Sequence, residues 1–158
     1  MPVSWVVPEN FHITLKFLGG VDDERIAALA DALRAAVDGE RAFGLEIVGL
    51  GAFPSATRPR VLWAGVAAGL EPLTTIAARV EQAMATQGFA PEERPFSPHL
   101  TLGRVREPRR APALSEALAA GATRRFGHVA IDSIALMRSD LSPRGARYSE
   151  LARLPLTR

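Results

Sequence analysis

A short pattern that occurs twice constrains this chain more than any other feature. Its two copies read His12-Ile13-Thr14-Leu15 and His99-Leu100-Thr101-Leu102. Alternation of polar and apolar residues is the period of a β-strand, so the histidine and threonine of each copy share one face and the apolar residues share the other. A hydrophobic core needs only the apolar faces. The polar faces, which hold two of the three histidines of the chain, therefore indicate a functional site.

The order of the remaining elements predicts an α+β architecture. Helices are expected over Asp22–Val37, Glu71–Gln87 and Pro112–Ala120, and strands over Phe11–Phe17, Phe43–Phe53, Arg60–Val66, His99–Val105, Phe126–Arg138 and Ala146–Leu151. Strands joined by short turns favour antiparallel sheets with helices packed on one side of each. Each half of the chain carries one His-x-Thr strand. We therefore expect one domain, residues 1–158, of two pseudo-symmetric lobes whose histidine faces meet across a central groove.

Composition limits the classes of protein that this chain can belong to. A hydrophobic content of 47% and a charged content of 23% are ordinary for a soluble globular domain. The sequence has no cysteine, which excludes disulfides and thiolate metal sites and fits a reducing compartment. No apolar run approaches the ~20 residues of a membrane span, and no basic-then-apolar leader opens the sequence. We expect a cytoplasmic monomer without membrane association.

The charge balance mildly favours an anionic partner. The formal net charge is only +2, but the sequence pI is about 9.9 because 18 of the 19 basic residues are arginine. The guanidinium group binds phosphate better than an ammonium group does. Four arginines, Arg104, Arg106, Arg109 and Arg110, follow the second copy closely. Charge of this size is compatible with nucleic-acid binding and does not establish it.

Two opposed histidines suit concerted acid–base catalysis. Near neutral pH one imidazole can be neutral and accept a proton from a nucleophile, while the other is protonated and donates to a leaving group. The neighbouring threonine hydroxyls can donate to an anion on which charge grows. Displacement at phosphorus needs an opposed base and acid together with donors for the non-bridging oxygens. The pattern supplies all of them without a metal.

Other interpretations of the same residues have less support. No Asp or Glu stands at metal-ligand spacing from either histidine, as it would in H-E-x-x-H, so no metal is expected. A serine-hydrolase interpretation fails because no G-x-S-x-G elbow is present. His128 has no threonine two positions later and is expected to be structural or exposed. For the matched pair, hydrogen bonding within the protein alone is the plain structural alternative.

The two copies resemble the tandem H-x-T-x motifs of the 2H phosphoesterase superfamily. The branch that they resemble most is the RNA 2′,3′-cyclic phosphodiesterases, also called 2′-5′ RNA ligases or LigT-like proteins. Nearly the whole chain takes part in the resemblance. The further matching segments are Trp5–Asn10, Lys16–Gly19, Gly51–Pro54, Pro59–Trp63, Phe96–Pro98, Arg138-Ser139, Leu141, Pro143, Gly145 and Tyr148.

This resemblance implies a bilobal fold with a central active-site groove and a reaction that needs no cofactor. The reaction would be hydrolysis of 2′,3′-cyclic phosphodiesters on RNA ends or nucleotides to 2′-phosphates. His12 would be the proton donor and His99 the acceptor, and Thr14 and Thr101 would hold the non-bridging oxygens. Ligation of RNA through a 2′-5′ bond in the same site is the alternative within enzymes. A non-catalytic RNA-binding module is the alternative from another class.

Three residues are candidate substrate contacts: Arg104, Phe17 and Tyr148. Strict strand alternation would place Arg104 on the face opposite His99 and Thr101, unless the strand bulges there. The resemblance also implies a strand and a helix upstream of Trp5 that this sequence does not contain, so either the first lobe lacks them or the natural protein has further residues before Met1. For a first lobe that lacks them, residues 1–7 are expected to run extended and to pair with its sheet or cover it, unless another copy of the chain does so.

Overall fold

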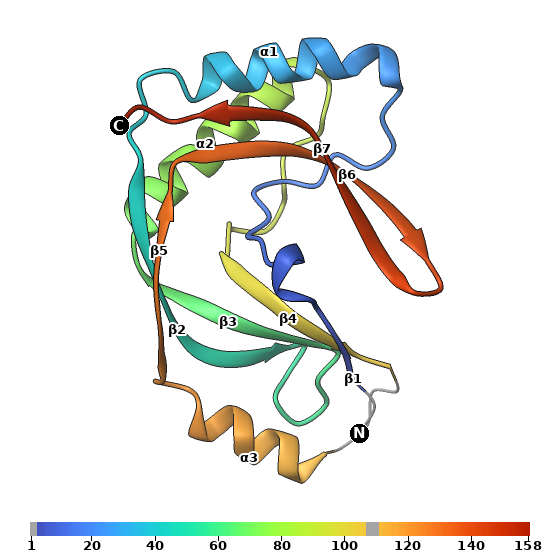
Figure 1. Ribbon diagram of the computed structural model, residues 1–158, viewed down its shortest axis with the longest axis vertical. Coiled ribbons are helices and arrows are strands. Elements are labelled where there is room, and N and C mark those ends of the chain that lie inside the picture. The colour runs from blue at the N-terminus through green and yellow to red at the C-terminus, as the bar shows by residue number, and fades with distance from the viewer. Residues whose placement is uncertain (1–2, 107–110) are drawn as a thin grey trace. The chain divides into compact units, whose positions relative to one another are not determined.

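The computed structural model describes residues 3–106 and 111–158 (Figure 1). Its strands are β1 (Val3–Trp5), β2 (Phe43–Phe53), β3 (Val61–Ala68), β4 (His99–Val105), β5 (Arg125–Ile131), β6 (Ser133–Ser142) and β7 (Gly145–Pro155). Its helices are α1 (Ile26–Ala36), α2 (Leu70–Thr86) and α3 (Pro112–Ala120), with 3₁₀ turns η1 (Pro8–Asn10) and η2 (Asp23–Arg25). Antiparallel sheets with helices packed on them confirm the predicted α+β class. None of the described helices is long and apolar enough to cross a membrane.

The chain divides into two compact units, each assembled from three stretches rather than from one half of the sequence. The first unit contains Met1–Thr14, Gly44–Leu70 and Ser97–Val129, and the second contains Leu15–Phe43, Glu71–Phe96 and Ala130–Arg158. Both His-x-Thr copies therefore belong to the first unit. The expectation of one copy in each lobe is wrong for this division, because the first copy pairs with the strand that carries the second.

A five-stranded sheet with the order β1-β4-β3-β2-β5 forms the body of the first unit. Its two faces differ, because residues opposite one another on neighbouring strands share a face. One face carries Leu62 and Val105, which form a small core with Leu118 of α3. Helix α3 thus covers this face, and Figure 1 shows it below the sheet. The opposite face of the sheet is the one that bears His99, and we call it the histidine face.

The second unit packs α1 and α2 on the two-stranded sheet of β6 and β7 (Figure 1). Leu29 and Leu33 of α1 meet Ile76 and Met84 of α2, and Leu154 of β7 completes this core. These apolar residues recur every three or four positions along the chain, which is the pattern that predicted both helices. Burial of each such side chain stabilises the fold by about 1.5–3 kcal/mol.

The structure also corrects two predicted strands. The segment expected as a strand over Phe11–Phe17 is mostly irregular, and only Ile13 takes part in a β-bridge. The strand expected over Phe126–Arg138 is two strands, β5 and β6, which belong to different sheets and are separated at Asp132. By contrast, Val3–Trp5 is extended and pairs with β4, which confirms the expectation for that part of residues 1–7.

Candidate active site

The two motifs lie on neighbouring segments of the same sheet. After β1 the chain continues along the edge of β4, and Val6 donates a backbone hydrogen bond to Leu102 O. The chain then turns through η1 and meets β4 again at Ile13, which forms an antiparallel bridge with Leu100. Proline at the start of η1 and an extended Phe11 make this return possible.

The register of that bridge sets the arrangement of the four polar residues. With Ile13 opposite Leu100, His12 falls opposite Thr101, and Thr14 falls opposite His99. Leu100 lies opposite the buried Ala64, so the histidines and threonines on either side of the bridge belong to the histidine face. His12 and His99 are then diagonal neighbours, which places their side-chain origins roughly 7–8 Å apart. A tetrahedral phosphate can be bracketed by imidazoles that start at that separation.

Each histidine is oriented by a backbone carbonyl two residues earlier in the chain. His12 Nδ1 lies 2.6 Å from Asn10 O, and His99 Nδ1 lies 2.9 Å from Ser97 O. A carbonyl oxygen only accepts, so Nδ1 carries the proton in both rings. The nitrogen that can exchange a proton with a substrate is therefore Nε2 in both cases. This shared arrangement gives the two histidines the same tautomer, and the motif alone did not reveal it.

Two aromatic rings pack against His99. The Phe53 ring meets the His99 ring edge to face at 5.0 Å between centroids, and the Trp63 ring lies 6.4 Å away. Phe53 and Trp63 also pack on each other at 5.4 Å. A Cβ at Gly51 would stand 2.2 Å from the Trp63 ring, so only glycine leaves room for that ring. These supporting residues lie in the segments Gly51–Pro54 and Pro59–Trp63. Both segments are part of the family resemblance, which gave them no role.

Exposure also separates the two histidines. His12 is exposed, whereas His99, Thr14 and Thr101 are half-buried. Strand β3 pairs with β4 from Gly65 opposite His99 to Trp63 opposite Thr101, so the second motif has strand backbone on its inner side. The first motif lies at the outer side of β4 and contacts it by one bridge. The site thus combines a firmly held histidine with one held at an edge.

A β-bulge moves Arg104 to the histidine face. Thr101 lies opposite Trp63 and Gly103 lies opposite Leu62, so Leu102 is an extra residue in β4. The bulge shifts the alternation by one position, and Arg104 falls opposite Val61, on the same face of β3 as Trp63. Strict alternation had placed Arg104 on the opposite face. That expectation is wrong because of the bulge, and Arg104 is exposed on the side of the histidines.

Several other residues that the sequence singled out belong to the second unit. Phe17 and Tyr148 belong to the second unit, where Phe17 is 78% exposed and Tyr148 is half-buried on β7. Lys16, which alternation placed beside His12 and Thr14, instead pairs with Glu81 of α2 at 2.5 Å, and its side chain is 3% exposed. His128 is exposed on β5. Arg109 and Arg110 lie outside the described residues.

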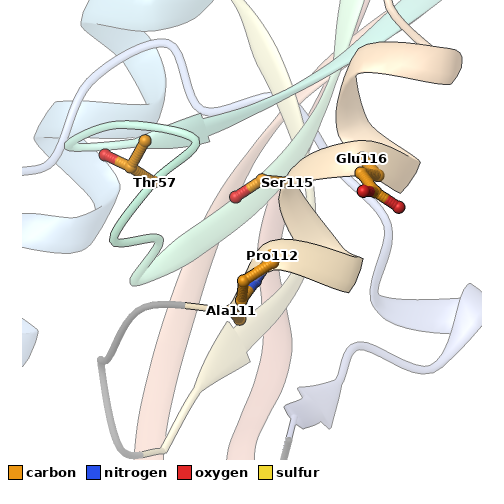
Figure 2. Close-up of a pocket in the computed structure, with 5 residues that line it drawn as sticks. All are labelled: Thr57, Ala111, Pro112, Ser115 and Glu116. Atoms are coloured by element: carbon orange, nitrogen blue, oxygen red, sulfur yellow. The ribbon is translucent and has the colours of Figure 1, made fainter.

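Within residues 3–106 and 111–158, no three His, Asp or Glu side chains gather closely enough to hold a metal ion. A hollow of about 280 Å³ is lined by Thr57, Ala111, Pro112, Ser115 and Glu116 (Figure 2). It lies between α3 and the loop before β3, and Ser115 Oγ donates to Ala56 O there at 2.6 Å. None of the motif residues lines this hollow.

Comparison with protein families gives one match that covers most of the chain. The model of the 2′-5′ RNA ligase superfamily matches residues 8–143. That segment contains both His-x-Thr motifs, the paired strands β2, β3 and β4, and Arg104.

Curated relatives and solved structures agree with this match. The chain is 41% identical over 151 residues to an RNA 2′,3′-cyclic phosphodiesterase of Aeropyrum pernix, covering 96% of this chain and 85% of that protein. It is 36% identical to the protein of the same name from Aquifex aeolicus, covering 92% and 78%. Among solved structures, TT0787 of Thermus thermophilus matches with a TM-score of 0.75 and 28% identity, covering 98% and 82%. LigT of E. coli, crystallised with NADP+, matches with a TM-score of 0.72 and 28% identity, covering 98% and 81%.

Proposed function

This chain belongs to the 2′-5′ RNA ligase superfamily, and from that premise we propose that it is an RNA 2′,3′-cyclic phosphodiesterase. It hydrolyses the cyclic phosphate at an RNA end to a 2′-phosphate. The observation that carries the proposal is the diagonal pairing of His12 and His99 across neighbouring segments, with both Nδ1 atoms on backbone carbonyls. The names of the curated relatives supply the substrate class.

The two histidines divide the proton transfers between them. His99 Nε2 takes a proton from water as the water oxygen forms a bond to phosphorus. His12 Nε2 gives its proton to O3′ as the P–O3′ bond breaks, which leaves a 2′-phosphate and a free 3′-hydroxyl. Solvent then takes a proton from His99 and returns one to His12. The carbonyls of Asn10 and Ser97 fit every stage, because Nδ1 stays protonated throughout.

Three further side chains act on the charge of the phosphate. Thr14 and Thr101 donate their hydroxyls to the non-bridging oxygens, on which negative charge grows. Their diagonal positions mirror those of the histidines, so the four groups surround one phosphate. Arg104, on the same face, supplies a guanidinium to the substrate. Phe17 and Tyr148 of the second unit are further candidate substrate contacts.

The chemistry uses no metal and no cofactor, and the enzyme works as a monomer in the cytoplasm on RNA. The absence of cysteine fits that compartment. The family name also includes 2′-5′ RNA ligation, in which a 5′-hydroxyl instead of water attacks the same cyclic phosphate and O3′ again leaves. Incubation of an RNA bearing a 2′,3′-cyclic end with one bearing a 5′-hydroxyl measures that ligase activity directly.

The test of the proposed function is a product assay. The four nucleoside 2′,3′-cyclic monophosphates are offered to the purified protein in the presence of EDTA, and the product isomer is identified by phosphorus NMR. The 2′-phosphate is expected as the single product. Formation of the 3′-phosphate would contradict the assignment of O3′ as leaving group, and abolition by EDTA with rescue by a divalent ion would contradict the metal-free mechanism.

A further inference from the structure

A second arginine lies near the site and is held in place by a hydrogen bond that the proposed chemistry does not need. Arg106 follows β4 directly, and its Nε donates to Ser4 Oγ at 2.8 Å. Ser4 is the middle residue of β1 and lies opposite Arg104. The bond therefore joins the segment that leaves β4 to the edge strand of the sheet.

The register places this pair on the histidine face. Ser4, Arg104, Val61 and Phe53 are opposite one another on four consecutive strands. The next pair of positions toward the histidines is Trp63 opposite Thr101. Ser4 and Arg104 thus lie on the face that carries the two catalytic histidines, beyond the threonines.

The separation from the histidines is too large for a single phosphate. On β3, Gly65, which is opposite His99, is four positions along the strand from Val61, which is opposite Arg104. At about 3.3 Å per residue, this is roughly 13 Å along the sheet. A stacked strand of nucleic acid advances only about 3.4 Å per nucleotide along its axis. A phosphate bound beside Ser4 therefore belongs to a different nucleotide from the one at the histidines.

The geometry of Arg106 suits a phosphate. Arg106 Nε donates to Ser4 Oγ, which leaves the two terminal nitrogens of the guanidinium group for a ligand. Together these nitrogens can donate to two oxygens of one phosphate. Arg104 and Arg106 are both exposed, and within residues 3–106 and 111–158 neither takes part in an ion pair. The two positive charges are thus available to one anionic ligand.

We propose that Arg106, held by Ser4, binds a backbone phosphate on the 5′ side of the terminal nucleotide. The inference rests on the proposed function and specifies its substrate as the end of an RNA chain rather than a cyclic mononucleotide. A cyclic phosphate terminates the 3′ end of an RNA, so every other phosphate of the chain lies on its 5′ side. A nucleoside 2′,3′-cyclic monophosphate has none of them and cannot use this subsite.

The test compares two substrates in four proteins. The kcat/KM values for adenosine 2′,3′-cyclic monophosphate and for a four-nucleotide RNA with the same cyclic end are measured for wild type, Arg106→Ala, Arg106→Lys and Ser4→Ala. Loss of a charge-assisted contact lowers the value for the RNA by about 10-fold in Arg106→Ala and leaves the mononucleotide value unchanged. Arg106→Lys keeps the charge and falls between wild type and Arg106→Ala, and Ser4→Ala shows a smaller loss of the same selectivity. Arg34→Ala removes an exposed arginine from α1 and serves as the charge control.

A binding measurement makes the result independent of turnover. The affinity of the 2′-phosphorylated product RNA is measured between 50 and 200 mM salt, roughly the range over which phosphate contacts dominate. Arg106→Ala is expected to lower the slope of log K against log salt by about 0.7, the value for one phosphate contact of a single strand. An unchanged slope, or an equal loss of kcat/KM on both substrates, would overturn the subsite. If wild type hydrolyses neither substrate, the proposed function fails and the slope still decides the subsite.

Discussion

The two His-x-Thr motifs share a sequence pattern but are held in different ways. His99 lies on β4, is half-buried and packs against Phe53, while β3 pairs along the inner side of its strand. His12 is exposed on an irregular segment that meets β4 through the bridge at Ile13. What the motifs have in common is the carbonyl at Nδ1. The proton-exchanging nitrogen is thus fixed by local backbone in both motifs, whereas of the two histidines His99 is the one that lies on a strand of the sheet.

The largest expected effect comes from removing either histidine. His12→Ala and His99→Ala should each lower kcat by about 10²- to 10⁴-fold, because each removes one proton transfer. The double variant should lose little more than the stronger single variant, since the two transfers occur in one step. His128→Ala, which removes the exposed histidine of β5, is the matched control and should keep full activity.

Binding of the product distinguishes these losses from those of an RNA-binding module. Equilibrium titration with a nucleoside 2′-phosphate should show affinity largely retained in both histidine variants. A protein that only binds RNA would instead have no turnover in wild type, and its histidine variants would change affinity alone.

Replacing the threonines tests whether the difference between the motifs extends to phosphate binding. Thr101→Val and Thr14→Val keep the side-chain shape and remove a hydroxyl that donates to a charged group. Each should lower kcat/KM by about 10- to 100-fold. We expect Thr101→Val to have the larger effect, because β3 holds the backbone of Thr101. A larger loss in Thr14→Val would show that the edge segment is the better ordered of the two in the enzyme–substrate complex.

Filling the space at Gly51 should disturb the second motif alone. A Cβ there would press on the Trp63 ring, which lies beside Phe53 and His99. Overpacking of this kind lowers the free energy of unfolding by about 1–3 kcal/mol. Thermal unfolding of Gly51→Ala should show that loss, with kcat reduced as His99 shifts. Gly20→Ala is the control, because a Cβ at Gly20 meets nothing within 4 Å and its φ is not positive.

The smallest effects are expected at the candidate contacts of the second unit. Phe17 is 78% exposed, so Phe17→Ala should change the free energy of unfolding by less than about 0.5 kcal/mol. If a base stacks on this ring, KM rises roughly 5-fold or more. Leu141→Ala, at an apolar residue that is 86% exposed, is the control. Tyr148→Phe removes only a hydroxyl and should raise KM less than Phe17→Ala does.

Periodicity predicted most of the elements, and it failed where tertiary pairing overrides local pattern. The apolar spacing of Leu29 and Leu33 gave α1, and the alternation around Leu45 and Ile47 gave β2. The residues after His12 alternate just as well, yet of these only Ile13 forms a bridge, because the chain leaves the first unit after Thr14. Periodicity describes a segment by itself and carries no information about the length of its pairing partner.

The chemistry of the site was more predictable than its support. The repeated motif named both histidines and both threonines, because their polar faces had no structural use. The bulge at Leu102 was not predicted, since nothing in His99–Val105 marks an extra residue, and it decides the face on which Arg104 lies. The hydrogen bonds from the histidines to the carbonyls of Asn10 and Ser97 were not predicted either, because every residue has a backbone carbonyl and the sequence does not mark these two. Trp63 over Gly51 depends on the register of β2 against β3, which the expectation of a hairpin between these two strands did not specify.

The pH dependence of kcat/KM tests the central claim most directly. Wild type in EDTA, acting on a cyclic mononucleotide, should give a bell-shaped profile, because one histidine must be neutral and the other protonated. His99→Ala removes the base, so its residual activity should lose the acidic limb. His12→Ala removes the acid, so its residual activity should lose the alkaline limb. A bell that survives intact in both variants would contradict the assignment of His12 and His99 as the acid and the base.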